Sequence, residues 1–97
     1  MPAYLLVTAT VTDPAKLQAY NAALHASGLY PRHGGRYIFV GRPAENLENW
    51  DGRAAVCAEF PDRAAAQAFW NSDEYQSRIK PLRDGAGSFH VAIFEGT

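Results

Sequence analysis

Four stretches of apolar, aromatic and β-branched residues run through the chain, and each has about the length of a single β-strand. They cover residues 3–11, 36–40, 54–60 and 88–94. The first half of the stretch 3–11 is apolar at consecutive positions, which predicts a strand that is covered on both of its faces. The polar residues 41–53 contain several turn formers and predict a loop.

Helical spacing replaces the strand pattern after the first stretch. Asp13 is a suitable N-cap, and Pro14 suits the first helical position, where its missing amide hydrogen is not needed. An apolar stripe then follows at positions i, i+3 and i+7, formed by Leu17, Tyr20 and Leu24. Gly28 is typical of a helix C-terminus, so we expect the first helix to end there.

A second helical region follows the third stretch. Asp62 is a suitable cap for an alanine-rich helix that extends to Trp70. Asn71, with Glu74 three residues later, fits a capping box that starts a shorter helix. The apolar face of this shorter helix is expected to carry Tyr75, Ile79 and Leu82. Pro81 is expected to kink or end it.

The resulting order, β-α-β-β-α-β, predicts an α+β domain of the ferredoxin-like class. We expect a four-stranded antiparallel sheet in which the first strand lies between the third and the fourth, with both helices on one face. The other face of the sheet is left open. It carries enough apolar surface that a second sheet should cover it.

The chain has 97 residues, which predicts a single domain over residues 1–97. A domain of this size buries only about 60–70% of its unfolded surface. It nevertheless has 5 Tyr, 5 Phe and 2 Trp, which is more large aromatic side chains than a domain of this size is expected to bury alone. We therefore expect a homodimer in which a second copy covers some of these side chains.

Charge and composition exclude several classes of partner. The formal net charge is −1 and basic residues are interleaved with acidic ones, so we expect no binding to nucleic acid. No apolar run approaches the roughly 20 residues that cross a membrane. The first residues lack the basic stretch of a secretory signal, and Cys57 has no second cysteine as a disulfide partner. A cytoplasmic location is expected.

Several short segments, in order along nearly the whole chain, resemble one known family. They are residues 34–37 (GGRY), Glu48 with Trp50, residues 59–61 (EFP), residues 70–76 (WNSDEYQ) and residues 95–96 (EG). This combination is similar to the domain-of-unknown-function 1330 family (DUF1330) of the dimeric α+β barrel superfamily. The resemblance implies two four-stranded sheets that face each other across a two-fold axis. Members of that superfamily include cofactor-independent monooxygenases, small isomerases and cyclases, and haem-binding enzymes.

Alternation along the predicted strands sorts the polar side chains onto one face. The apolar sets, such as Val56 with Ala58 and Phe60, are expected to pack on the helices. The opposite face then carries Thr8, Thr10, Cys57, Glu59 and His90. We predict Glu59 and His90 as catalytic residues, because a carboxylate and an imidazole in one enclosed space can transfer protons near neutral pH. The structural alternative is that both make hydrogen bonds or ion pairs at the dimer interface.

Predicted substrate-binding residues come from several segments. Arg36 follows two glycines that permit close backbone approach, and its guanidinium can hold an anionic group. Its alternative is an ion pair with a surface acid. The other predicted substrate-binding residues are Tyr37, Trp50, Trp70, Tyr75 and Thr8. The aromatic members of this set can equally be core residues.

His25, His33 and His90 are widely spaced, so we expect no metal site, and no cofactor motif is present. The leading functional hypothesis is a small cofactor-independent enzyme that performs acid–base or oxidative chemistry on a small aromatic or polyketide-like metabolite. The alternative is a non-catalytic homodimer that is structural or holds a small-molecule ligand. A haem-binding protein is a weaker alternative.

Overall fold

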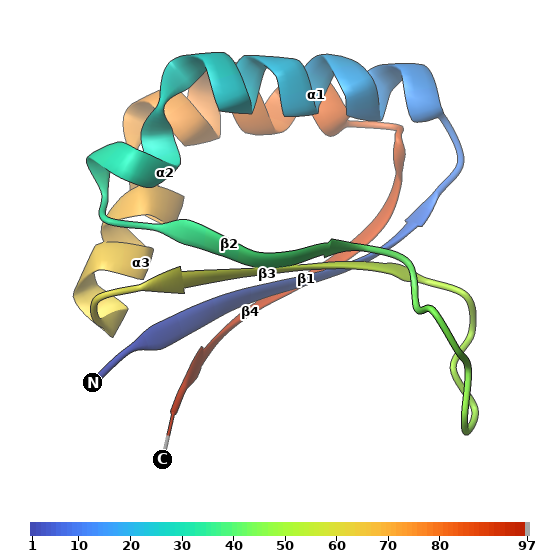
Figure 1. Cartoon of the computed structure of the whole chain (residues 1–97). Helices are drawn as coiled ribbons and strands as arrows, with labels where there is room; N and C mark the ends of the chain where they lie inside the picture. The colour runs from blue at the N-terminus through green and yellow to red at the C-terminus, as the bar shows by residue number, and fades with distance from the viewer. Residues whose placement is uncertain (97) are drawn as a thin grey trace.

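The protein folds as one antiparallel sheet with all of its helices on one side, as Figure 1 shows for the computed structural model, which describes residues 1–96. The strands are β1 (Ala3–Val11), β2 (Arg36–Gly41), β3 (Ala54–Phe60) and β4 (Gly87–Glu95). The helical segments are α1 (Pro14–Ser27), α2 (Leu29–Arg32), α3 (Arg63–Asn71), η1 (Tyr75–Ile79) and η2 (Lys80–Arg83). The strand order is β2-β3-β1-β4, which confirms the predicted ferredoxin-like arrangement with β1 between β3 and β4.

The predicted division of side chains between the two faces of the sheet is also present. Leu5 lies opposite Ala58 and Ile93, and these side chains face the helices. Thr8 lies opposite His90 on the other side of the sheet. We call the side that bears the helices the helix face and the other side the open face. A bulge between Tyr37 and Phe39 shifts the register where β2 pairs with β3.

The first helix begins and ends as its sequence predicts. The Asp13 carboxylate accepts a hydrogen bond from the Lys16 amide (3.3 Å), and Gly28 closes α1 in the left-handed conformation at φ 66°. Asp62 caps α3 in the same way through the Ala65 amide (2.8 Å). The chain continues after Gly28 into the short helix α2, which the sequence analysis did not predict.

The capping box predicted at Asn71 is displaced by one residue. Asn71 still belongs to α3, and the backbone first leaves helical conformation at Ser72. The Ser72 hydroxyl therefore accepts the hydrogen bond from the Tyr75 amide (3.2 Å). Glu74 does not complete a capping box, because its carboxylate pairs with Arg32 at 2.7 Å.

The apolar face predicted for the last helical region is correct only as far as Ile79. The segment η1 is a π-helical turn and η2, which contains Pro81, is a 3₁₀ turn. The angular step per residue differs between these geometries and the α-helix, so α-helical spacing fails beyond Ile79. Leu82 is consequently exposed, and Arg83 takes the inward position with only 8% of its surface exposed.

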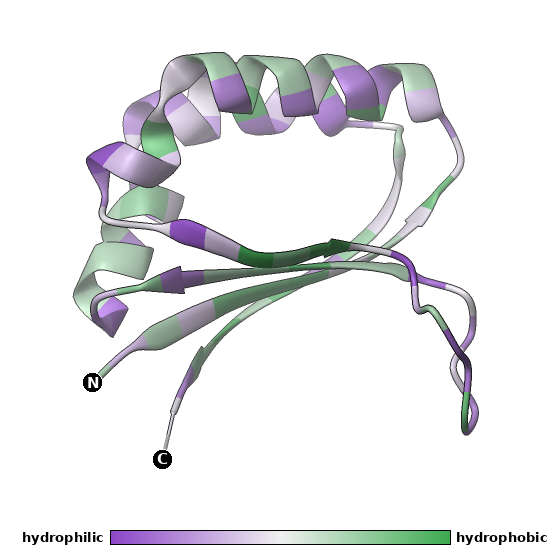
Figure 2. Ribbon diagram, in the orientation of Figure 1, coloured by the Kyte–Doolittle hydropathy of each residue, from purple (hydrophilic) through white to green (hydrophobic). Residues whose placement is uncertain are grey.

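A cluster of aromatic rings fills the space between the sheet and α3. Phe69 of α3 is its centre, and its ring centroid lies 4.6 Å from that of Tyr30, 5.5 Å from that of Phe60 and 4.9 Å from that of Tyr75. Gly35 enters β2 directly over this cluster, where a Cβ atom would lie 2.7 Å from the Phe60 ring. The predicted close backbone approach at the two glycines is therefore present. Figure 2 shows the hydrophobic middle of the strands beside helices of mixed polarity.

Candidate functional site

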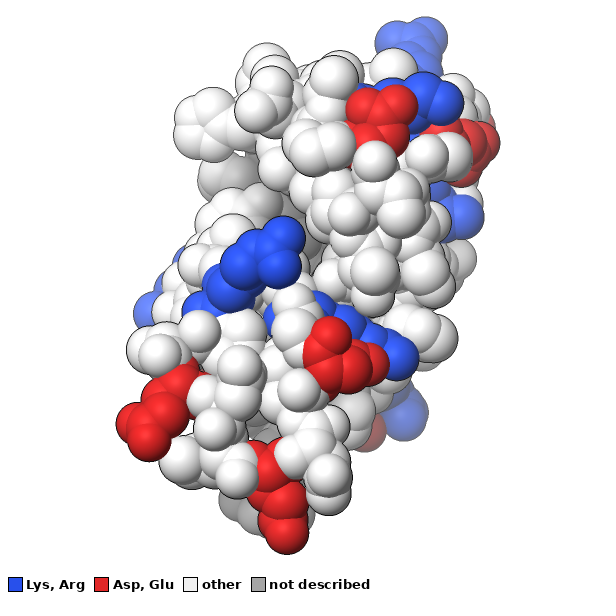
Figure 3. All heavy atoms as spheres, turned by 90° about the vertical axis from the view of Figure 1, so that its right-hand side faces the viewer, with Lys and Arg blue, Asp and Glu red and all other residues white. Residues whose placement is uncertain are grey.

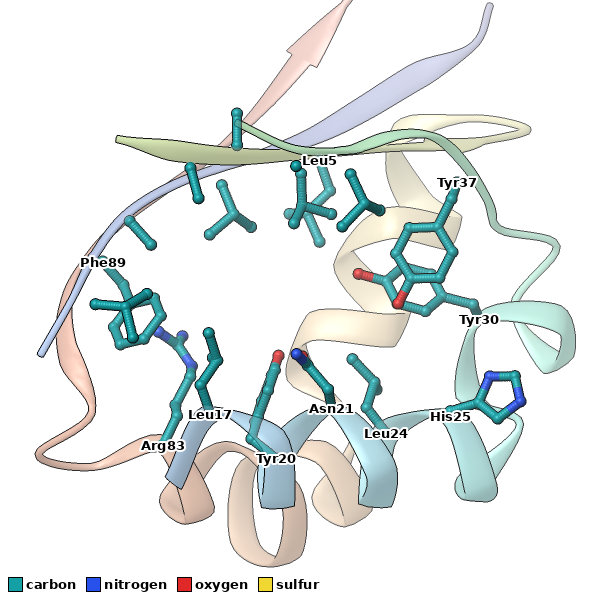
Figure 4. Close-up of a pocket in the computed structure, with 18 of the residues that line it drawn as sticks. Leu5, Leu17, Tyr20, Asn21, Leu24, His25, Tyr30, Tyr37, Arg83 and Phe89 are labelled. Atoms are coloured by element: carbon teal, nitrogen blue, oxygen red, sulfur yellow. The ribbon is translucent and has the colours of Figure 1, made fainter. Parts of the chain in front are cut away.

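A cavity of about 400 Å³ lies between the helix face of the sheet and the helices. Figure 4 shows side chains from both layers pointing into it. Its wall includes 20 residues, most of them apolar, from β1, α1, α2, β2, β3, α3, η1, η2 and β4. This volume is in the range of pockets that enclose small organic ligands. The cavity therefore has the size and apolar character of a small-molecule site.

The size of side chains explains why the space stays open. The sheet contributes small residues to the cavity floor, among them Ala9 and Ala54. At one end the rings of Tyr30 and Tyr37 stand between the layers, with centroids 4.7 Å apart. At the other end Phe89 and Arg83 fill the gap (Figure 4). The large side chains at both ends hold α1 away from the sheet, and Ala9 and Ala54, which lie in register with Phe89, leave the floor beside Phe89 unfilled.

Arg83 brings a positive charge to one end of this apolar space. Its guanidinium carbon lies 4.3 Å from the centroid of the Phe89 ring and 5.6 Å from that of Tyr20. Its Nε atom is buried and has no hydrogen-bond partner among the described residues. Cation–π contact stabilises such a charge only in part. A buried donor without an acceptor lowers the stability of the folded protein. An acceptor atom of a ligand at this end of the cavity would remove that cost.

The hydroxyl groups of Tyr20 and Tyr75 form a second polar feature. Their oxygens lie 2.8 Å apart, so one hydroxyl donates to the other. Burial raises the pKa of Tyr20 far above its usual value, and it also raises the pKa of Tyr30 and of Tyr37. These three phenols stay protonated near neutral pH. They can donate hydrogen bonds to a ligand, but they are not bases.

Three predicted substrate-binding residues are brought together in this cavity. Tyr37 of β2, Trp70 of α3 and Tyr75 of η1 all contribute to its wall. Arg36 does not join them, because it lies on the open face and its guanidinium pairs with the Glu59 carboxylate across the strands at 2.8 Å. The surface ion pair weighed as the alternative for Arg36 is the arrangement that the structure has.

The open face holds the remaining predicted residues. Thr8 and Trp50 line a shallow hollow there, and the Trp50 indole N–H donates to the Arg53 carbonyl (3.0 Å). His90 is the exposed neighbour of Thr8 on β4. Glu59 of β3 lies opposite Tyr4 of β1, whereas His90 of β4 lies opposite Thr8 of β1. Tyr4 and Thr8 are four residues apart, which is about 13 Å along an extended strand. Within one chain, the expected convergence of Glu59 and His90 is therefore absent.

The sequence analysis missed four residues that the cavity uses. They are Tyr20, Asn21, Arg83 and Phe89. Tyr20 was assigned to the apolar stripe of the first helix, so the inward direction of its side chain was predictable. Nothing in the spacing pointed to Arg83, because α-helical periodicity places Leu82 inside instead.

Charged side chains are mixed in sign over the surface beside the cavity. On the face shown in Figure 3, acidic and basic side chains are interspersed among uncharged ones. No three His, Cys, Asp or Glu residues within residues 1–96 lie together in a way that could hold a metal ion. None of the helices in that range is long and apolar enough to cross a membrane.

Comparison with known families assigns the chain. The model of the family "Domain of unknown function (DUF1330)" matches residues 2–97. The protein therefore belongs to this family, as the segments quoted from its sequence indicated. No curated protein matches the sequence at a significant level.

Solved structures with the same fold are distant in sequence. SnoaB, a cofactor-independent oxygenase from Streptomyces nogalater, is 12% identical with a TM-score of 0.67, and the match covers 99% of this chain and 93% of SnoaB. A dimeric ferredoxin-like protein of unknown function from Jannaschia sp. CCS1 is 18% identical (TM-score 0.69, covering 99% and 100%). A dimeric ferredoxin-like protein of unknown function from Thermobifida fusca YX is 12% identical (TM-score 0.70, covering 99% and 92%). At these identities the likeness concerns the fold.

Proposed function

We propose that this protein is a homodimer that binds a small aromatic or polyketide-like metabolite in the helix–sheet cavity of each subunit. We further propose that it converts this ligand without a cofactor, by acid–base or oxidative chemistry. The observation that carries the proposal is the largely apolar, partly open cavity of about 400 Å³ with few polar groups at its ends. The likeness of the fold to a cofactor-independent oxygenase supports it. The cytoplasmic location expected from the sequence stays a prediction.

The dimer part of the proposal rests on the open face. Phe39 and Phe94, both 51% exposed in the single chain, lie on this face together with Leu6 and Ala92. An apolar sheet face of this kind is typical of a surface that packs against a second sheet. The neighbours from Jannaschia and Thermobifida are described as dimeric, which agrees with this arrangement.

One observation favours the alternative of a ligand carrier without turnover. The buried phenols of the cavity are held in their protonated form, since burial raises the pKa of Tyr20 and Tyr30. His25, at the exposed end of the cavity wall, is the remaining lining residue whose side chain can serve as a base. Catalysis by proton transfer therefore requires His25 or a ligand that ionises without help.

The experiment that tests the proposal compares ligand binding by the wild-type protein with ligand binding by a variant whose cavity is filled by a larger side chain. A thermal-shift screen of phenolic, keto and aromatic acid compounds, with haemin included, is run on the wild-type protein and on Val7→Phe. Val7 lies on β1 and contributes to the cavity wall, so a phenylalanine there occupies the space a ligand needs. Ala64→Phe on α3 is the matched control, because it adds the same ring at an exposed position.

Ligands of the wild-type and Ala64→Phe proteins that fail to bind Val7→Phe support a site in this cavity. A bound compound consumed in air, without metal or cofactor, supports the enzyme, and one bound unchanged supports the carrier. A haemin hit with a Soret band that is lost in His25→Ala supports the haem alternative. Identical ligand responses in all three proteins contradict a site in the helix–sheet cavity.

A further inference from the structure

The cavity holds one permanent charge, and the protein does not neutralise it. Arg83 is more than nine-tenths buried, and none of the ion pairs within residues 1–96 includes it. Asp84, the nearest acid in the chain, lies in an adjoining hollow together with Lys80. The opposite charges of Lys80 and Asp84 offset each other in that hollow, which leaves Arg83, a residue that lines both spaces, as the charged group at this end of the cavity. The end of the cavity near Phe89 is therefore positively charged.

A buried charge without a partner is unfavourable, so folds rarely retain one without a reason. The planar guanidinium is suited to a two-point contact with a planar oxyanion. The tyrosine pair is close to it, because the Tyr20 ring lies 5.6 Å from the Arg83 guanidinium carbon. One hydrogen of the Tyr20–Tyr75 pair is used within the pair, which leaves the other available for donation to a ligand oxygen.

The protonation state of the other residues that line the cavity decides which kind of oxyanion can bind to Arg83. A phenol or enol must lose its proton before it can neutralise Arg83. The buried tyrosines cannot take that proton, since they are themselves kept protonated. His25 belongs to α1 near its C-terminal end, at the far end of the cavity from Arg83 and Phe89 (Figure 4). A ligand that arrives already ionised needs no base.

We propose that the cavity is specific for a ring-containing carboxylate, with Arg83 as the residue that binds the carboxylate group while the apolar wall encloses the ring. This inference rests on the proposed function, because it assumes that the same cavity binds a ligand. It goes further by naming the ligand's charge and the residue that recognises it. The ring then lies over Ala9 and Ala54, and the carboxylate lies against η2.

Matched probe pairs test this directly. The probes are benzoate, naphthalene-2-carboxylate and anthracene-2-carboxylate, each with its primary amide, which has the same shape and no charge. Dissociation constants are measured at pH 7 by isothermal titration calorimetry for the wild type, Arg83→Met and Arg78→Met. Arg78 is exposed on η1 and contributes to no described cavity wall, so it controls for the loss of one positive charge.

We expect at least one acid to bind the wild type about tenfold or more tightly than its amide, because hydrogen bonds to charged groups are stronger than neutral ones. Arg83→Met should lose this preference, and Arg78→Met should keep it. Arg83→Lys provides a second variant in case the methionine protein does not fold. Arg83→Lys retains the positive charge but lacks the planar guanidinium. The preference of this variant for the acid over the amide should therefore be at least about threefold smaller than that of the wild type.

The possible results separate the two proposals. If acids and amides bind the wild type equally well, or if Arg83→Met keeps the preference for acids, the carboxylate inference is wrong while the cavity remains a ligand site. If no acid and no amide of any ring size binds, both proposals are contradicted.

Discussion

The guanidinium carbon of Arg83 lies 4.3 Å from the centroid of the Phe89 ring, at the border between an apolar cavity and a more polar hollow. The Phe89 ring is the nearer of the two rings that contact the guanidinium, and it orients the planar group. It does not supply an acceptor for the buried Nε hydrogen. Arg83 is thus held in a position that favours ligand binding over the stability of the empty protein.

This relationship predicts that Arg83→Met stabilises the ligand-free protein. Replacing a buried ion pair by apolar side chains of similar volume is neutral or stabilising by about 1–4 kcal/mol, and Arg83 lacks even the partner that offsets part of the desolvation cost in such a pair. The lost cation–π contact with Phe89 offsets about 1–2 kcal/mol of that gain. We expect a net increase of about 1 kcal/mol, which is a rise in Tm of roughly 4–8 °C for a domain of this size.

Calorimetric melting of wild-type protein, Arg83→Met and Arg78→Met checks this expectation. The exposed Arg78 should change the unfolding free energy by less than about 0.5 kcal/mol. A fall in the Tm of Arg83→Met by several degrees would mean that the arginine is a structural element of the fold rather than a ligand-binding one.

The Tyr20–Tyr75 hydrogen bond predicts a non-additive pair of substitutions. Tyr20→Phe or Tyr75→Phe alone leaves one hydroxyl without its partner, which should cost about 1 kcal/mol. The double variant removes both hydroxyls, so it should be less destabilised than the sum of the two single variants. Urea unfolding of the four proteins measures this cycle, and strict additivity would show that the two hydroxyls do not interact in solution.

Much of the fold was predictable because strand alternation and helix caps are local properties. Asp13 and Asp62 cap the helices that their positions indicated, and Thr8 and His90 lie on the same face of the sheet, as counting along the strands indicated. The same counting placed Ala58 and Phe60 toward the helices, where both are buried. Each of these inferences depends on a periodicity that the backbone maintains.

The candidate site was less predictable because it depends on departures from that regularity. The π-helical turn at η1 and the 3₁₀ turn at η2 exchange Leu82 for Arg83 on the inner side, and no spacing rule signals this. The existence of the cavity is likewise non-local. It depends on the rings of Tyr30 and Tyr37 at one end and of Phe89 at the other, which come from positions distant in sequence.

The open sheet face predicts that a charge will break the dimer. Phe39 is 51% exposed on this face, so Phe39→Glu would bury a carboxylate between two sheets. We expect light scattering at micromolar concentration to give the mass of one chain for Phe39→Glu and of two chains for the wild type. Leu82→Glu is the matched control, because Leu82 is 40% exposed on the helical side and should leave the dimer intact. A wild-type mass near one chain would contradict the dimer itself.

The catalytic roles predicted for Glu59 and His90 stay predictions, and their positions make them testable apart from the cavity. Both residues lie on the open face, and Glu59 is paired with Arg36. We therefore expect Glu59→Gln and His90→Ala to change the dissociation constant of the naphthalene-2-carboxylate probe by less than about twofold, whereas Arg83→Met weakens it about tenfold or more. The Arg36–Glu59 pair is partly exposed, so its loss should cost no more than about 1 kcal/mol of stability. Loss of turnover in either open-face variant, with probe binding intact, would instead locate the chemistry between the two sheets of the dimer.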